Sequence, residues 1–189
     1  MGKIAENIRL RLKNAIDKAI DSQLLIAAGK AAGAEAVNQM IKRTQSGKDI
    51  NGNKFGGYNQ SYKKKLAYKY AVKKYGRTQY ASNKASDKLQ LTGNLLSSLA
   101  YKVKSIKRAS NDIIFTIELY IKGDLENKKA EGLQSATGRT RTGSRYAKKK
   151  WEFFGLSKKG ANVAVEVKAI QKALFEKLQQ KFKTMSKVA

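Results

Sequence analysis

Hydrophobic residues recur every four positions from the start of the chain, and this spacing predicts a long amphipathic helix. The series consists of Ile4, Ile8, Leu12, Ile16, Ile20 and Leu24. An alanine-rich continuation to Met40 extends the predicted helix over residues 3–43. Gly29 and Gly33 fall inside it, where each costs about 1 kcal/mol relative to alanine. These glycines therefore indicate either a bend in the helix or a close packing contact.

A helical spacing of apolar residues returns near the end of the chain and predicts a second long helix. Its apolar positions are Val163, Val167, Ile170, Leu174, Leu178, Phe182 and Met185. Shorter helices are predicted after the capping residues Ser61 and Thr92, and over residues 126–133. The pattern thus places the two long helices on either side of a central region with short elements.

Two segments in that central region predict strands. In residues 100–107, Tyr101 and Val103 alternate with a second set that includes Ile106. Residues 113–121 are rich in Ile, Phe, Thr and Tyr, which favour strands. The polar segment between them can turn the chain, so the two strands are expected to pair in antiparallel fashion. We therefore expect a single α+β domain, with long N- and C-terminal helices packed on a small antiparallel sheet.

Two segments rich in glycine and short polar residues, 44–60 and 135–145, are predicted to protrude from this domain. Asn51-Gly52 is a strong signal for a type I′ turn, and Phe55 lies beside its tip. Neither segment has enough apolar residues to order itself, so both are expected to contact neighbouring molecules.

The composition excludes several kinds of chemistry. Cysteine and histidine are both absent, so the chain has no thiolate nucleophile, no imidazole base and neither of the commonest transition-metal ligands. We expect no cofactor and no metal site. The longest aliphatic stretch, residues 24–28, is far shorter than the roughly 20 residues that span a bilayer. No membrane partner is expected either.

The net charge is the most unusual property of the sequence. Lys and Arg number 40 against 14 acidic residues, which gives a charge of +26. A surface of this kind attracts phosphate backbones and acidic protein faces. Nucleic acid, an acidic protein, and a simply solvated lysine-rich surface all remain open as interpretations. Tyrosines among the lysines, such as Tyr58 and Tyr62, could stack bases or pack in a protein interface.

Three candidate catalytic patterns fail on their spacing or their partners. Residues 47–49 resemble the end of a phosphate-binding loop, but Lys42 stands where that loop needs its first glycine. Glu166 matches half of a metal-dependent nuclease motif, yet its place in a helical pattern favours a solvated helix face. Asp112 and Glu118 share a strand face and could converge, but they lack a base or a third ligand. We therefore expect that the chain is not an enzyme.

Three short motifs follow one another along the chain. Residues 47–55 read Gly-Lys-Asp-Ile-Asn-Gly-Asn-Lys-Phe, and residues 58–65 continue with Tyr58 and Ser-Tyr-Lys-Lys-Lys. Residues 91–99 read Leu-Thr-Gly-Asn-Leu-Leu-Ser-Ser-Leu, and residues 153–157 read Phe-Phe-Gly-Leu-Ser. The first resembles the G-x-D-x-x-G-x-x-F loop followed by S-x-x-Y-x-x-x-K of phage virion morphogenesis proteins. The second resembles their L-T-G-x-L-x-x-S-L segment, and the third their R-x-F-x-G-L-S motif. Residues 147–150 are Ala and Lys where that family usually has Pro-x-Arg.

The resemblance implies a function in the phage particle. The family comprises tail-completion, tail-terminator and head–tail joining proteins, which work as rings in the neck, so a structural virion protein of that region is expected. A free basic nucleic-acid-binding protein is the alternative. The implied partners are copies of the chain in a homo-oligomeric ring, other neck, portal-side or tail proteins, and packaged DNA in the channel. The implied location is the virion, after assembly in the bacterial host cytoplasm. The candidate interaction residues are Phe55, Tyr58, Tyr62, Lys63, Lys64, Lys65, Arg139, Arg141, Arg145 and Trp151.

Overall fold

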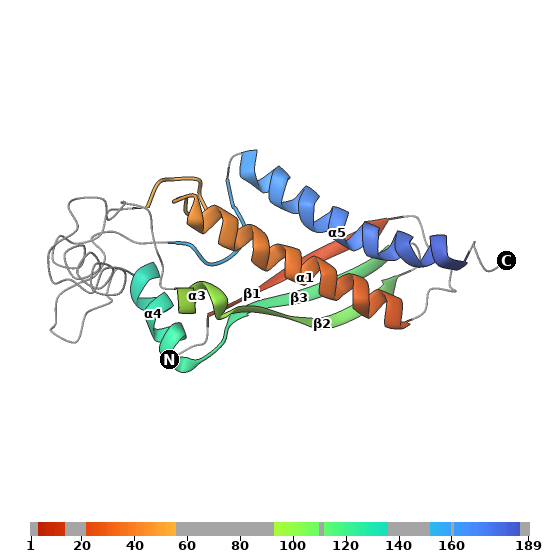
Figure 1. Cartoon of the computed structure of the whole chain (residues 1–189), viewed down its shortest axis with the longest axis horizontal. Coiled ribbons are helices and arrows are strands. Elements are labelled where there is room, and N and C mark those ends of the chain that lie inside the picture. Colours follow the sequence, from red (N-terminus) through yellow and green to blue (C-terminus); the bar gives the residue numbers. More distant parts are fainter. Residues whose placement is uncertain are drawn as a thin grey trace, which may run out of the picture.

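Two long helices lie on one side of a three-stranded antiparallel sheet (Figure 1). The computed structural model describes residues 4–13, 22–55, 93–109, 112–135, 152–159 and 161–185. In chain order the elements are β1 (Ala5–Lys13), α1 (Ser22–Gln45), α3 (Gly93–Ser97), β2 (Leu99–Ala109), β3 (Asp112–Ile121), α4 (Asp124–Gln134) and α5 (Ala161–Met185). Helix α1 packs against β2 and β3, and α5 packs along α1. The expected single α+β domain is confirmed.

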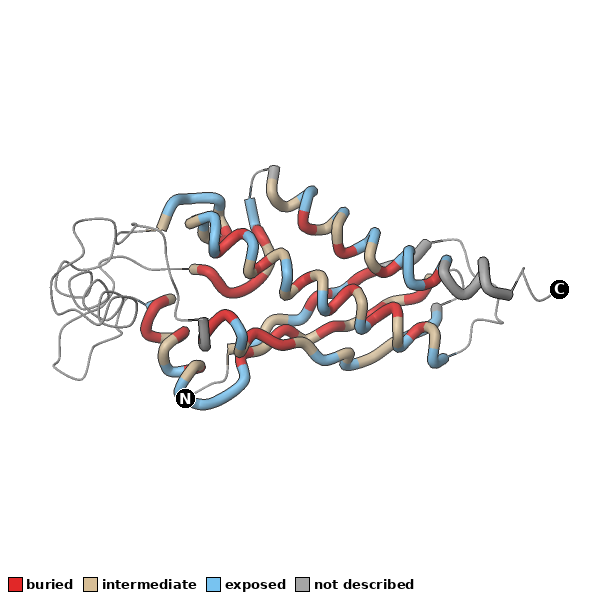
Figure 2. The backbone as a smooth tube through the Cα atoms, viewed as in Figure 1, coloured by how far each residue is buried: buried red, intermediate tan, exposed pale blue. Residues whose placement is uncertain are grey.

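The sheet has the order β1-β3-β2, with β3 in the centre and antiparallel pairing on both sides. Residues of β3 are alternately buried and half-buried, because successive side chains point to opposite faces of the sheet. Its buried set is Ile113, Phe115, Ile117, Leu119 and Ile121. Together with apolar residues of the two long helices, this face forms one hydrophobic core (Figure 2).

The prediction of one helix over residues 3–43 is wrong in its first part. Residues 5–13 form strand β1, residues 14–21 lie outside the described residues, and α1 begins at Ser22. A spacing of four is an even number, so it keeps residues on one face of a strand as well as on one face of a helix. Leu10 fills the position between Ile8 and Leu12, and this alternation with arginine was the strand signal.

The predicted elements of the later part of the chain are confirmed with small changes in their bounds. The segments 100–107 and 113–121 correspond to β2 and β3, the segment 126–133 to α4, and the C-terminal series to α5. The short helix expected after Thr92 is α3. Thr92 itself and the helix expected after Ser61 lie outside the described residues.

Strand β2 contains a bulge, since its register against β3 shifts between Val103 and Ser105. Beyond the shift Ile106 pairs with Phe115, while Val103 pairs with Ile117 before it. The extra residue therefore brings Ile106 to the core side of the sheet, where it packs against the core. The predicted strict alternation, which placed Ile106 on the sheet face opposite to that of Val103, is wrong because of this bulge.

Gly29 and Gly33 allow α1 to lie close to the sheet. A Cβ atom on Gly33 would overlap the ring of Tyr101, and one on Gly29 would lie 3.3 Å from Phe115 Cδ1 and from Val103 Cγ2. Both glycines lie within the continuous helix α1 and are buried. The sequence allowed either a bend in the helix or a close packing contact at these glycines, and the structure shows the close packing contact.

Candidate functional site

Arg43 lies in a buried polar cluster that joins both long helices to the segment 153–157. Its Nη1 atom donates a hydrogen bond to Glu166 Oε1 at 2.7 Å, and both side chains are nearly inaccessible to solvent, at 3% and 4% exposure. Its Nη2 atom donates to the backbone oxygens of Phe153 and Gly155, at 2.8 and 2.6 Å. The guanidinium thus connects the last turns of α1 to the start of α5 through the intervening segment.

Glu166 uses both of its carboxylate oxygens within this cluster. Oε2 accepts a hydrogen bond from the backbone N of Ser157 at 2.7 Å, and Oε1 accepts one from Ser157 Oγ at 2.8 Å. The prediction of a solvated helix face at Glu166 is therefore wrong. The sequence does contain a signal for the burial of Glu166, because this residue lies four positions before Ile170 in a four-residue spacing that continues to the buried Leu174 and Leu178.

Glu6 of β1 approaches the same segment from the sheet. Partial burial raises the pKa of its carboxyl group, and Glu166 adds to the rise. Lys158, a backbone hydrogen bond from Leu156 and the charge of Arg43 lower the pKa, but burial is the larger effect. A Cβ atom on Gly155 would overlap the Glu6 carboxylate, and Gly155 has a φ of 104°, a backbone conformation that favours glycine.

Residues 47–55 form a tight turn held by Asp49. The carboxylate Oδ1 accepts hydrogen bonds from the backbone N atoms of Asn51 and Asn53, at 2.9 and 2.7 Å. The Gly52 N atom donates to the Asp49 backbone O at 3.1 Å, and Gly52 has a φ of 83°. The turn is therefore centred on Ile50 and Asn51, one residue before the predicted Asn-Gly pair, and Gly52 supplies the left-handed residue that follows.

This turn docks on the chain itself. Ile50 is buried, its N atom donates to the Glu152 backbone O at 2.8 Å, and its O atom accepts from Lys158 N at 2.7 Å. Asn51 Nδ2 also donates to Glu152 Oε2 at 2.8 Å. For residues 44–55, the expectation of a protruding segment ordered by an outside partner is therefore wrong. Residues 56–60 and 136–145 lie outside the described residues.

Of the ten candidate interaction residues, the structure describes Phe55. Its side chain is half-buried and packs against the core, and its N atom donates to the Gly47 backbone O at 2.9 Å. The other nine lie outside the described residues: Tyr58, Tyr62, Lys63, Lys64, Lys65, Arg139, Arg141, Arg145 and Trp151. Their role in interactions stays a prediction.

The carboxylates considered for catalysis do not meet. Asp112 and Glu118 are six residues apart on β3, which corresponds to about 20 Å along a strand, so they cannot converge. Glu118 pairs instead with Lys104, at 3.3 Å between Oε1 and Nζ. Within the described residues, no group of three or more acidic side chains could hold a metal ion. No helix in that part of the chain is both long and apolar enough to cross a membrane.

The polar cluster therefore has the chemistry of a structural joint. One guanidinium, two carboxylates and one hydroxyl are engaged with each other or with the backbone of residues 153–157. In comparisons with known proteins, no family model, no curated protein and no solved structure matches the chain.

Proposed function

We propose that this chain is a structural protein of a bacteriophage particle, which forms a ring in the neck or tail-completion region between capsid and tail. The observation that carries the proposal is the meeting of two of its three motifs. Residues 47–55 dock on residues 152–158 through both backbone hydrogen bonds of Ile50, and Arg43 binds two backbone oxygens of the Phe-Phe-Gly-Leu-Ser motif. Residues 47–55 and 153–157, which carry part of the family resemblance, thus lie together at one joint.

A joint of this kind suits a ring subunit. Each subunit of a closed ring must present the same two complementary surfaces, so its helices must keep a fixed relation to its sheet. Arg43 fixes the end of α1 to the start of α5, and Glu6 brings β1 to the same segment. In this proposal the polar side chains of the joint hold the fold, and the chain catalyses no reaction and uses no cofactor.

The net charge of +26 supports a particle role in which the chain is surrounded by anionic neighbours. A ring multiplies the charge of each subunit, so it gains stability when its neighbours are acidic. Acidic portal-side, neck or tail proteins and packaged DNA fit this requirement. The proposed location is the virion, after assembly in the host cytoplasm.

The test asks whether the purified chain forms rings and where the chain lies in the phage particle. The purified chain is imaged by negative-stain electron microscopy and weighed by light scattering, and phage particles are labelled with an antibody against the chain. Closed rings, together with antibody at the junction of capsid and tail, are expected. A chain that stays monomeric at all concentrations and is missing from purified particles would contradict the proposal.

A free nucleic-acid-binding protein is the second candidate, and the same charge of +26 favours it. Binding through phosphate contacts releases counterions, so the affinity for DNA should fall steeply with salt, with a slope of roughly −0.9 per phosphate neutralised. The measurement is DNA binding by the isolated chain over a range of salt concentrations. Tight binding with a steep slope, combined with the absence of rings, would favour this candidate over the particle role.

A further inference from the structure

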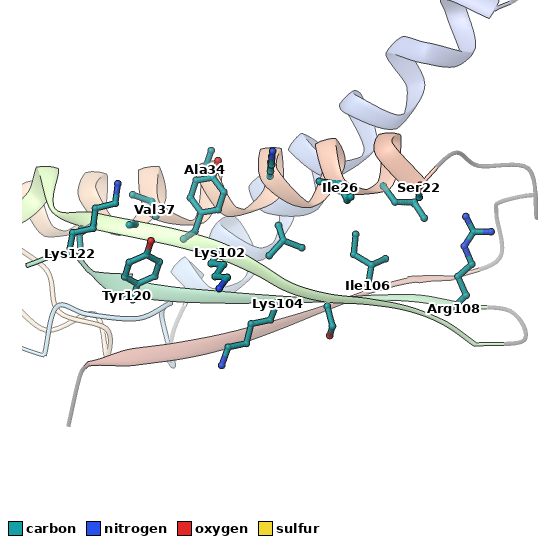
Figure 3. Close-up of a pocket in the computed structure, with 17 residues that line it drawn as sticks. Ser22, Ile26, Ala34, Val37, Lys102, Lys104, Ile106, Arg108, Tyr120 and Lys122 are labelled. Carbon is teal, nitrogen blue, oxygen red and sulfur yellow. The ribbon is translucent and has the colours of Figure 1, made fainter. Parts of the chain in front are cut away.

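A groove of about 990 Å³ runs between helix α1 and strand β2 (Figure 3). Its lining combines aliphatic side chains with two tyrosines and several basic residues, and the aliphatic ones include Leu25, Ile26 and Val37 from the helix and Val103 and Ile106 from the strand. Ile26 is 43% exposed, although its neighbour Leu25 is buried. The groove therefore offers apolar surface that the described part of the chain leaves open to solvent.

The floor of this groove ends at an open sheet edge. Strand β2 lies at one edge of the sheet, and within the described residues no strand pairs with its outer side. An edge strand presents unpaired backbone N–H and C=O groups, to which an extended peptide can add as a further strand. Alternate side chains of such a peptide would face α1 and fill the aliphatic groove. The bulge between Val103 and Ser105 limits regular pairing to one stretch of the edge at a time.

Lysines at the rim of the groove favour a peptide of negative charge. Lys30 on α1, Lys102 on β2 and Lys122 after β3 line it, and no carboxylate does. These three lysines have no acidic partner among the described residues. Lys102 points to the sheet face away from α1, because its partner Glu118 lies between buried residues of β3, so acidic residues on that face of an added strand would lie beside Lys102. Lys30 on α1 adds to the positive field that attracts an acidic peptide and repels a basic one.

A second copy of this chain does not supply such a peptide from its own sheet. Strand β2 contains no acidic residue, and β1 contains Glu6 against two arginines and a lysine. Strand β3 is acidic, but it is paired on both sides. A nucleic acid also fits the charge, but its bases stack on aromatic faces. Of the two tyrosines in the lining, Tyr101 packs its ring against Gly33 of α1 and Tyr120 lies on the face of β3 away from the core, so aliphatic side chains face the space between α1 and β2.

We propose that the groove between α1 and β2 binds an extended segment of another protein, in which apolar and acidic residues alternate, by adding it as a fourth strand at the edge of β2. This inference goes beyond the particle role, since it rests on the edge, the walls and the rim of the groove and holds whether or not the chain forms a ring.

The test uses the full chain and a synthetic probe, a fluorescein-labelled peptide of about ten residues in which Val and Glu alternate, which is the length of a strand. Binding is followed by fluorescence anisotropy, and amide hydrogen exchange shows which backbone groups become protected. The expected results are saturable binding, slower exchange in β2, and no binding of the matching Val and Lys peptide. Failure of the Val and Glu peptide to bind, or protection elsewhere in the chain, would overturn the inference.

Charge reversal separates the groove from the general charge of the protein. Lys30→Glu with Lys102→Glu should weaken peptide binding by about tenfold or more. The matched control is Lys128→Glu with Lys168→Glu, which makes the same change in net charge at exposed positions of α4 and α5 and should leave binding near that of the parent chain. Equal weakening in both variants would overturn the inference. Ile26→Glu, at a position that is 43% exposed, should also weaken binding.

A competition experiment decides between a protein and a nucleic-acid occupant. Oligothymidine is added to the complex of the chain with the labelled peptide at physiological salt. The inference expects that the peptide remains bound and that β2 stays protected. Displacement of the peptide by oligothymidine, with the same protection of β2 by the oligonucleotide alone, would show that the groove serves nucleic acid instead. Neither outcome depends on whether rings form, so the proposed particle role is tested separately.

Discussion

Arg43 and Glu166 form a buried ion pair across 123 positions of sequence, with 2.7 Å between Nη1 and Oε1. A charge left in the interior without its partner costs about 3–5 kcal/mol, whereas an apolar pair of similar size can be close to neutral. Removing either Arg43 or Glu166 alone should therefore destabilise the fold.

Arg43→Met is expected to lower the free energy of unfolding by about 3–5 kcal/mol, because Glu166 stays buried without a cation. The double variant Arg43→Met with Glu166→Leu should recover only the part of that loss that comes from the unpaired charge, because the backbone groups of Phe153, Gly155 and Ser157 still lack their partners. Urea denaturation of the two single variants and the double variant measures the coupling. Single variants within about 0.5 kcal/mol of the parent chain would show that the pair does not hold α1 to α5.

Gly33→Ala should destabilise the fold by about 1–3 kcal/mol, because the added methyl group overlaps the ring of Tyr101. In an exposed helix the same change would stabilise by about 1 kcal/mol, so the sign alone is informative. Thermal or urea unfolding provides the value. Combining it with Tyr101→Ala should remove most of the specific penalty, and a stabilising effect of Gly33→Ala in the parent chain would contradict the close approach.

The raised pKa of Glu6 predicts a pH dependence of stability. A carboxyl group whose folded pKa lies above its ordinary value of 4.5 binds its proton more tightly in the folded state. Its contribution is then full below pH 4.5 and is lost as the pH rises through the folded pKa. Glu6→Gln, which cannot lose a proton, should therefore gain stability relative to the parent chain as the pH rises above 4.5. Unfolding measured from pH 4 to 7 tests this, and a difference that stays constant or changes in the opposite direction would contradict it.

Asp49→Ala removes the acceptor of two backbone hydrogen bonds in the turn of residues 47–55 and should cost about 1–2 kcal/mol. Because that turn docks on residues 152–158, the variant should also become easier to cleave there by a protease. Limited proteolysis with mass spectrometry locates the cuts. Lys48→Ala, at an exposed neighbouring position, is the control and should be cut like the parent chain. A turn that resists cleavage in both variants would mean that Asp49 does not hold it.

The elements that the sequence could predict are those whose signal is local. Period-two and helical spacing were sufficient for β2, β3 and α5, since each of them shows one face to the core. The helix predicted for residues 4–13 is wrong because a spacing of four fits a strand as well as a helix, and the partner that decides between them is β3, about 100 residues later in the chain.

The polar cluster could not be predicted by the same means. Glu166 was expected in solvent because a lone carboxylate is rarely buried. The four-residue spacing places Glu166 on the buried face of α5, but its burial depends on Arg43, which nothing local connects to it. The bulge in β2 was also invisible, because the pattern alone does not show where a register shifts. Local patterns therefore predicted the elements, while the joint between them depends on contacts distant in sequence.

The pairing of Ala5 with Tyr120 and of Lys13 with Asp112 has a consequence for biosynthesis. Strand β1 is made first, but its partner leaves the ribosome only after more than 100 further residues have been translated. Until then its apolar residues Ile8 and Leu10 have no sheet to join, so the nascent chain exposes an unpaired strand for several seconds at about 5–20 residues per second. The Arg43–Glu166 contact closes later still, because Glu166 leaves the ribosome 123 residues after Arg43.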